Sequence, residues 1–378
     1  KNIVQNFRLN EASIELGEAV VTAKRADENV SSAQTGVQQM QVKQLNKLPV
    51  LLGEKDIIKS LELMPGVKSA GEGSTGFFVR GGTADQNLIM LDNVSIYNAS
   101  HLLGFFSTFN SDVLEDVTLY KGGIPAQYGN RLSAILDVQQ RIGDMQDFKV
   151  SGGIGLISSK LNVEGPLQKG KSSFLIGGRR TYADALARLS GIKEAKNAWL
   201  YFYDLNAKLH FVLSEKDRLS ATAYWGRDKM VLKDMASTGW GSLLGSIKWT
   251  RVQNDALSFN TTLSYNRYSY DMEMTMGVKE SLEAALEDYV LKSEMQYRPS
   301  DKSVWRIGLN SSYHNISPGK FFMSSNNDFS MKLLNRYAWE NNIFASNQLK
   351  LGNKFEFIYG LRLSIILGYG KRRVLYLE

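Results

Sequence analysis

The feature that most constrains the fold of this chain is an alternation of apolar and polar residues, which runs through residues 147–378. Between Leu200 and Leu213, the odd positions carry aromatic or aliphatic side chains, and the even positions include charged and amide side chains. Successive side chains of a β-strand point to opposite faces of the sheet, so this pattern predicts a strand with one apolar and one polar face. The same pattern recurs over residues 305–314 and, less regularly, over residues 257–266.

About ten segments of this kind can be counted, and each is at least as long as the ~9 to 11 residues that a tilted strand needs to cross a bilayer. They lie near residues 148–167, 172–182, 199–213, 217–229, 241–252, 256–271, 287–298, 303–315, 334–350 and 354–367. The sequence therefore predicts an antiparallel transmembrane β-barrel, here about ten strands of it, after an α+β domain.

The connections between these segments alternate in length. Short turns are expected near residues 168–171, 214–216, 253–255, 299–302 and 351–353. Long connections are expected near residues 183–198, 230–240, 272–286 and 317–333, with a local helix or charged loop over Glu280 to Glu287. Short turns on one side and long loops on the other are typical of an outer-membrane barrel, whereas a soluble sandwich rarely strings so many long hairpins in meander order.

Aromatic residues near the ends of the expected strands suit the two aromatic belts of a membrane barrel. They are Trp199, Tyr201, Trp225, Trp240, Trp249 and Trp339.

The chain before Gly143 has a different texture and predicts one compact α+β unit. Glu54 to Met64 is the best helix candidate, because its apolar residues fall near helical spacing and Pro65-Gly66 ends it. Residues 113–120 are expected to form a helix-turn or a strand, and residues 134–139 a last short strand.

The stretch from Gly76 to Tyr97 is expected to be the centre of this unit. Two apolar runs flank Gly81-Gly82, which predicts a hairpin, and Asp92-Asn93 predicts a second turn. Arg80, just before the glycine pair, is the charged residue of most interest.

Composition excludes several kinds of function. The chain has no cysteine and only three widely spaced histidines, so neither a cysteine nucleophile nor a histidine-rich metal site is expected, and no cofactor is expected. No nucleophile, base and acid stand at a recognisable spacing, which argues against an enzyme. The net charge of +7 is spread along the chain, so no nucleic-acid partner is expected.

The expected number of strands is small for a barrel that encloses a separate domain. About ten strands would close only a narrow barrel, whereas a transporter barrel with a plugged lumen has about 22. We therefore expect the chain to hold about half of its barrel as an open curved sheet, through truncation or a shifted reading frame.

Three stretches resemble the TonB-dependent outer-membrane receptors. They are GEAVVTAKR (Gly17 to Arg25), MPGVKSAGEGSTGFFVRGGTADQNLIMLDNVSIYNASHLLGFFSTFN (Met64 to Asn110) and DVTLYKGGIPAQYGNRLSAILDV (Asp116 to Val138). The resemblance is closest to the branch that carries a carboxypeptidase-regulatory-like domain before the plug. It divides the chain into residues 1–26, the tail of that domain with a coupling box, residues 27–146, the plug domain, and residues 147–378, the partial barrel.

The resemblance implies a non-enzymatic importer in the outer membrane of a Gram-negative bacterium. Such a receptor takes up a scarce or large nutrient with energy from an inner-membrane complex. The implied partners are a TonB-like periplasm-spanning protein, a small or oligomeric ligand, outer-membrane lipid and, as an option, a surface lipoprotein. The ligand itself is not indicated, since long loops read it.

The resemblance also assigns roles to particular residues. Glu18, Ala19, Val20, Val21, Thr22 and Ala23 are similar to the family's coupling box, and a β-prone segment on a polar tether can add as a strand to a partner's sheet. The other interpretation of this segment is a final strand of the preceding domain.

In the plug, the candidate residues for its core and its contact with the barrel follow the family's glycine-bearing motifs. They are Arg80, Gly81, Gly82, Asp92, Lys121, Gly122 and Arg131. Arg80 is expected either to pair with a carboxylate of the plug or barrel wall or to be a solvated turn residue, and Asp92 is expected to form a turn rather than to bind ligand. Lys121 and Arg131 are alternatives for the family's second plug arginine.

Two other functions remain open from the sequence. One is an outer-membrane sensor that signals through an upstream domain, and the other is a soluble, basic, β-rich binding protein.

Overall fold

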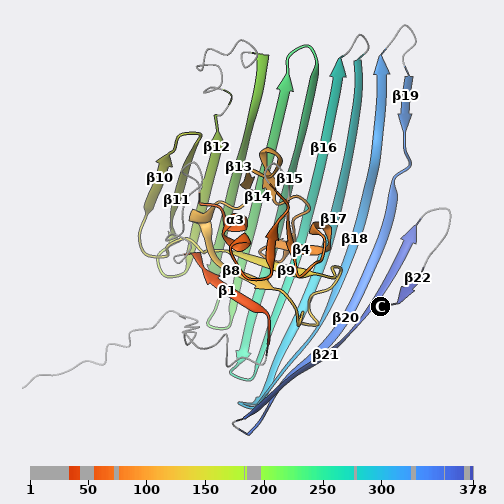
Figure 1. Ribbon diagram of the computed structural model, residues 1–378. Coiled ribbons are helices and arrows are strands. Elements are labelled where there is room, and N and C mark those ends of the chain that lie inside the picture. Colours follow the sequence, from red (N-terminus) through yellow and green to blue (C-terminus); the bar gives the residue numbers. More distant parts are fainter. Residues whose placement is uncertain are drawn as a thin grey trace, which may run out of the picture. The chain divides into compact units, whose positions relative to one another are not determined.

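A computed structural model shows a large open antiparallel sheet with a small α+β domain against one of its faces (Figure 1). The structure describes residues 34–42, 55–71, 76–182, 184, 197–275, 279–324, 329–352, 354–369 and 375–377. Contacts between Cα atoms place residues 33–378 in one unit. None of the helices among the described residues is long and apolar enough to span a membrane.

The large sheet is a meander in which each strand pairs with the next, and the short β19 pairs with β18 beside this path. Its strands are β10 (Lys149–Ile154), β11 (Ser158–Gln168), β12 (Ser172–Thr181), β13 (Ala198–Val212), β14 (Asp217–Leu232), β15 (Ala236–Asn254), β16 (Leu257–Thr275), β17 (Lys279–Ser300), β18 (Ser303–Ser324), β19 (Phe329–Lys332), β20 (Arg336–Leu351), β21 (Phe355–Tyr369) and β22 (Leu375–Leu377). This sheet confirms the predicted fold class, an α+β domain followed by barrel-type antiparallel strands.

The first expected strand, near residues 148–167, is in fact two strands. β10 and β11 are joined by a tight turn, which is closed by the N–H of Gly155 donating to the carbonyl of Ser158 (2.8 Å). The sequence alternates weakly here because of its glycines, so the turn left no visible break in the pattern.

The strands are longer than the alternation predicted. Most of the connections expected near residues 230–240, 272–286 and 317–333 belong to strands, and the described turn between β14 and β15 is short. Glu280 to Glu287, expected as a helix or loop, lies in β17 and pairs with both β16 and β18. Cross-strand neighbours decide the conformation of this segment, and they outweigh the helical preference of its Leu, Ala and Glu residues.

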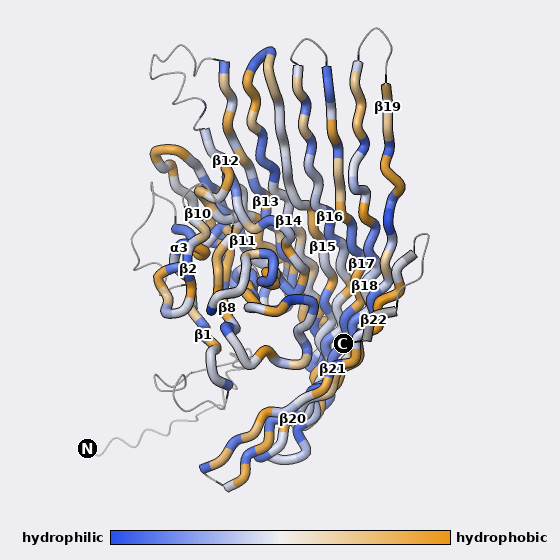
Figure 2. The backbone as a smooth tube through the Cα atoms, turned by 45° about the vertical axis from the view of Figure 1, so that its right-hand side comes forward, coloured by the Kyte–Doolittle hydropathy of each residue, from blue (hydrophilic) through white to orange (hydrophobic). Residues whose placement is uncertain are grey.

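The two faces of the sheet have opposite chemistry, as the alternation predicted, and blue and orange alternate along the strands in Figure 2. The inner face, which we define as the face against the α+β domain, buries polar side chains, among them Asn206, Lys208, Thr222, Asp228, Ser246, Thr262, Asn266, Asp288, Ser312 and Asn342. The outer face exposes apolar ones, among them Leu205, Leu209, Trp225, Ile247, Leu263, Leu291, Ile307 and Ile343. A soluble sandwich would have the reverse arrangement.

Aromatic side chains form two rows on the outer face. Tyr265, Tyr289 and Tyr313 lie in register on three neighbouring strands, with ring centroids 5.1 and 6.4 Å apart. In the second row, Tyr297 is in register with Trp305. The rows are about 26 Å apart along β17, the same order as the ~25 Å apolar band of an outer-membrane barrel.

Of the six aromatic residues predicted from the sequence, three are exposed on the outer face and one is buried on the inner face. Trp225, Trp249 and Trp339 are exposed on the outer face, whereas Trp240 is only 6% exposed and lies on the inner face in line with Leu244. The expectation for Trp240 is therefore wrong. It rested on the nearness of Trp240 to a strand end, and nearness to a strand end does not determine the face on which a side chain lies.

The α+β domain is built on a five-stranded sheet in the order β1-β8-β9-β4-β5. Its elements are β1 (Val37–Gln41), α3 (Ile57–Glu62), β2 (Val67–Ser69), β3 (Phe77–Val79), η1 (Ala84–Gln86), β4 (Asn87–Leu91), β5 (Val94–Ser95), β6 (Ser100–His101), η2 (Leu102–Gly104), β7 (Phe106–Ser107), η3 (Ser111–Val113), β8 (Leu114–Tyr120) and β9 (Ala134–Gln140). Helix α3 is shorter than expected: Asp56 caps it by accepting from the N–H of Lys59 (3.0 Å), and Leu63 ends it.

The hairpin predicted around Gly81-Gly82 does not form. β3 pairs with β2, while β4 pairs in parallel with β9, which is far along the chain. The true hairpin joins β4 to β5 through Asp92 and Asn93, whose φ angles of 47° and 69° suit a two-residue turn that matches the twist of the strands.

Candidate functional site

The α+β domain meets the inner face of the large sheet through buried polar side chains. On the side of β11 to β14, most of the contacts involve at least one charged side chain. On the side of β16 to β21, a cavity lies between the two parts.

His101 is the centre of the best-enclosed cluster. Its Nδ1 atom lies 2.6 Å from Asp228 on β14, and its Nε2 atom lies 3.3 Å from Asp204 on β13. A neutral imidazole carries a hydrogen on only one nitrogen, so a carboxylate at each nitrogen is best served by the doubly protonated, charged ring. Asp204 also accepts from Arg179, at 3.0 and 2.7 Å, which balances two carboxylates with two cations.

The surroundings of His101 favour its charged form despite complete burial. Burial alone would lower its pKa, but the hydrogen bonds to Asp204 and Asp228 outweigh this effect and raise the pKa of His101 above its ordinary value. The ring stacks on Phe202 at 4.0 Å. The partners of His101 lie on strands far along the chain, so nothing local in the sequence marks this cluster.

Asp92 is both a turn residue, as expected, and an anchor to the sheet. Its carboxylate accepts from Lys208 (3.0 and 3.1 Å), from Thr222 (2.7 Å) and from the N–H of Gln140 (3.0 Å). All four groups are buried. A buried carboxylate with these partners is fully hydrogen-bonded, so Asp92 joins β4 and β9 to β13 and β14.

Two further ion pairs tie the domain to β11. Asp112 in η3 accepts from Lys160 (2.8 Å), and Arg141, just after β9, pairs with Glu164. Neither pair was anticipated from the sequence, because nothing local marks a surface lysine or glutamate as a cross-domain partner.

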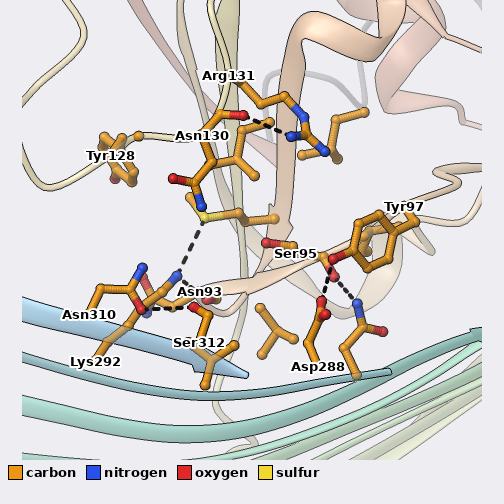
Figure 3. Close-up of a pocket in the computed structure, with 18 of the residues that line it drawn as sticks. Asn93, Ser95, Tyr97, Tyr128, Asn130, Arg131, Asp288, Lys292, Asn310 and Ser312 are labelled. Atoms are coloured by element: carbon orange, nitrogen blue, oxygen red, sulfur yellow. Dashed lines mark hydrogen bonds between the residues drawn. The ribbon is translucent and has the colours of Figure 1, made fainter. Parts of the chain in front are cut away.

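A cavity of about 350 Å³ lies between the domain and strands β16 to β21 (Figure 3). On its sheet side, His314 lies 2.6 Å from Asp288 and 3.7 Å from Glu340. On its domain side, Tyr97 donates to Asp288 and Asn130 donates to Glu340 (3.0 Å). The cavity is therefore closed at this end by hydrogen bonds between neutral and charged groups.

Side chains on both walls of the cavity present polar atoms that lack partners. Among the described residues, the amide oxygens of Gln127 and Asn266 are buried without a hydrogen bond. Burial together with the Asp288 carboxylate raises the pKa of Tyr97, so its hydroxyl stays a donor. Buried polar atoms of this kind are normally paired with water or a ligand, so the cavity suits a polar occupant.

The other predicted plug residues lie at the turns of the domain. Arg80 has a φ of 48° and an exposed side chain, and among the described residues no carboxylate is within ion-pairing distance of it. Its guanidinium instead lies over Gly122, where a Cβ would meet Nη1 at 2.7 Å. The expected ion pair of Arg80 is thus not formed by this part of the chain, and the alternative, a solvated turn arginine, describes it better.

Lys121 is buried, unlike Arg80, and donates to the carbonyl of Pro65 (2.8 Å). Burial, and then the nearby Arg80 charge, lower its pKa. Arg131 donates to the carbonyl of its neighbour Asn130 (2.7 Å). Gly81 has a φ of 88°, and a Cβ at Gly82 would meet Ser133 Oγ at 2.3 Å, so both positions require glycine.

The coupling box, Glu18 to Ala23, lies outside the described residues. Among the residues that the structure does describe, no group of three or more histidine or acidic side chains is arranged to hold a metal ion.

Comparison with known proteins connects this geometry to a family. Residues 29–134 match the family model of the TonB-dependent receptor plug domain. A search of curated proteins finds no match.

Solved structures share the fold at low sequence identity. The chain is similar to the ferric enterobactin receptor PfeA from Pseudomonas aeruginosa, with a TM-score of 0.66, 15% identity, and coverage of 88% of this chain and 58% of that one. It is similar to FpvA from P. aeruginosa, with a TM-score of 0.70, 11% identity, and coverage of 92% and 53%. It is also similar to the copper transporter OprC, with a TM-score of 0.66, 11% identity, and coverage of 91% and 58%.

The chain thus spans little more than half the length of these solved structures, and its α+β domain is the plug. Two of these structures are described as a receptor and a transporter, and the likeness to them shows a shared fold. Residues 29–134 therefore belong to the TonB-dependent receptor plug domain family, and the chain as a whole shares the fold of solved receptor and transporter structures at low sequence identity.

Proposed function

We propose that the protein imports a scarce or large nutrient across the outer membrane of a Gram-negative bacterium. The observation that carries this proposal is the plug on a polar inner face, combined with an outer face that is apolar between two aromatic rows. A polar interior suits a hydrated solute, and an apolar exterior of this height suits lipid.

Growth experiments can identify the imported ligand. The similar structures are named for ferric enterobactin, for an iron–pyoverdine complex and for copper. One fold thus serves chemically different ligands. A strain that lacks the full-length gene should fail to grow on one or a few single nutrient sources on which its parent grows. Normal growth of the deletion strain on every source tested would contradict the proposal.

Energy is proposed to arrive through a TonB-like protein that grips Glu18 to Ala23 by strand addition. Deleting these six residues from the full-length protein should abolish energised uptake and leave ligand binding intact, because the segment precedes the plug. A matched control deletes the same number of residues shortly before the box, Glu11 to Leu16, which leaves both the box and the plug complete. Equal rates of uptake in the two deletion variants would contradict the assignment of the coupling box.

A further inference from the structure

The plug is not held equally by the two sides of the sheet. Towards β11 to β14, which we call the anchored side, its contacts include charged pairs: Asp112 with Lys160, Asp92 with Lys208, and His101 with Asp204 and Asp228. Removing one partner of a buried ion pair leaves an unpaired charge, so these contacts resist separation strongly.

Towards β16 to β20, which we call the open side, no ion pair joins the described residues of the plug to those of the sheet. Tyr97 and Asn130 of the plug donate to Asp288 and Glu340, and the sheet donates to carbonyls of the plug backbone. Asn266 donates to Ser95 (2.6 Å), and Lys292 donates to Asn93 (2.7 Å). A neutral plug group released from such a bond can be taken up by water, and Asp288 and Glu340 keep His314 as a partner within the sheet, so separation on this side costs less than separation of paired buried charges.

The open side already contains two cavities stacked along the strands. The upper one, described above, reaches Ser264 and Asn266 of β16, and the lower one, of about 330 Å³, reaches Asn260 and Thr262 of the same strand. Five residues line both cavities: Asn93, Gln127, Tyr128, Lys292 and Asn310. The two cavities therefore meet at one constriction.

Lys292 closes this constriction from the sheet side. Its ammonium group reaches across to the carbonyl of Asn93, and it lies 4.0 Å from the sulfur of Met90 (Figure 3). On the plug side, Tyr128 donates to Asp137 (3.0 Å), which is enclosed at the lower cavity. On β17 the two cavities run from Asp288 to Glu294, about 20 Å along the strand.

We propose that the route of the ligand runs between the plug and strands β16 to β20, through these two cavities, and that Lys292 is the gate between them. The proposal rests on the proposed import function. The plug pivots on its ion pairs with β11 to β14 and opens the other side. It need not leave the barrel. The lining of amides, hydroxyls and charges of both signs suits a hydrated polar solute, whatever its identity.

Two buried threonines on neighbouring parts of the inner face allow a matched test. Thr262 is 5% exposed and lines the lower cavity, and Thr222 is 6% exposed and contacts Asp92 on the anchored side. Because this sequence contains no cysteine, Thr262→Cys and Thr222→Cys each introduce a single thiol into it with little change of volume. The probe is a sulfonated, membrane-impermeant maleimide added outside intact cells that carry the full-length protein.

Energising the inner membrane should speed labelling of Thr262→Cys about tenfold over cells treated with a protonophore, and leave Thr222→Cys unchanged. In protonophore-treated cells, Lys292→Met should give a similar rise at Thr262→Cys only. Loss of one charge-assisted hydrogen bond corresponds to a factor of about ten.

The outcomes separate the route from the import function. Faster labelling of Thr222→Cys, or of both thiols alike, on energisation would overturn the route while supporting energised import. An effect of Lys292→Met without any effect of energisation would support the route and contradict the import function. No change at Thr262→Cys in either arm would overturn the gate.

Discussion

At the level of single residues, the plug is held by charges whose partners are matched across the interface. His101 and Arg179 bring two cations to Asp204 and Asp228, and Lys208 brings one to Asp92. Such pairs contribute little net stability compared with apolar packing, but they penalise any position of the plug that separates them. They therefore fix where the plug sits more than how tightly it binds.

The charge of His101 makes plug docking sensitive to pH. Because its folded-state pKa is raised, its stabilising contribution is fully present below the ordinary value of about 6.5 and is lost as pH rises through the folded-state value. Denaturant should thus release the plug of the full-length protein more easily at pH 9 than at pH 6. Glutamine cannot titrate in this range. His101→Gln should therefore lower the free energy of plug release at pH 6 by ~3 kcal/mol and make that free energy nearly independent of pH.

A second histidine is the control for this experiment. His210 on β13 lies 2.9 Å from Ser220 of the next strand, so His210→Gln should leave the pH dependence of plug release as in the wild type. Identical pH profiles for wild type and His101→Gln would contradict the role assigned to His101.

At the level of elements, β12 shows how closely the plug approaches the sheet. A Cβ at Gly177 would lie 2.5 Å from both Val113 of η3 and Asn162 of β11. The neighbouring Gly178 faces the other way, and a Cβ there would have no neighbour closer than 3.8 Å. The contact with the plug therefore requires glycine at position 177, whereas the space around position 178 would admit a side chain.

This difference can be measured with two single substitutions. Gly177→Ala should destabilise plug docking by ~1–3 kcal/mol, because the added methyl group overpacks the contact with η3. Gly178→Ala should change it by no more than ~0.5 kcal/mol. Denaturant midpoints for plug release in the full-length protein give both values, and equal shifts would mean that η3 does not press on β12.

At the level of the whole molecule, the aromatic rows place the sheet relative to a membrane. The row of Tyr265, Tyr289 and Tyr313 is followed along the strands by a polar row, in which Arg267 lies 3.5 Å from Glu287 and Asn315 donates to Glu287 (3.0 Å). This change from aromatic to charged residues is expected where lipid gives way to water. Beyond it, β17 and β18 continue as paired strands.

Arginine substitutions on β17 test this placement. Leu291→Arg, between the two aromatic rows, should lower the unfolding free energy of the full-length protein in lipid by ~2–4 kcal/mol, since its charge would face the hydrocarbon. Ser281→Arg, beyond the polar row on the same strand, should change it by ~1 kcal/mol or less. Reversible unfolding in guanidinium from vesicles measures both, and a larger loss for Ser281→Arg would contradict the placement.

Much of the architecture was predictable because it depends on residues that are close together in the sequence. The side-chain period of two along a strand specifies which residues lie on the outer face and which face the plug, and this assignment holds along β13 from Tyr201 to Phe211. The glycine-bearing motifs of the plug likewise carry the family resemblance. Where local pattern and neighbouring strands disagree, as in Glu280 to Glu287, the local interpretation is wrong.

The sequence by itself therefore determined the class of fold, the two faces of the sheet and the plug domain family of residues 29–134. Only the tertiary structure decided that β4 pairs in parallel with β9, that His101 meets Asp204 and Asp228, and that Lys292 stands between two cavities. The physical reason is distance along the chain. A periodic pattern is set by neighbours within one strand, whereas these contacts join residues far apart in the sequence and depend on register and packing.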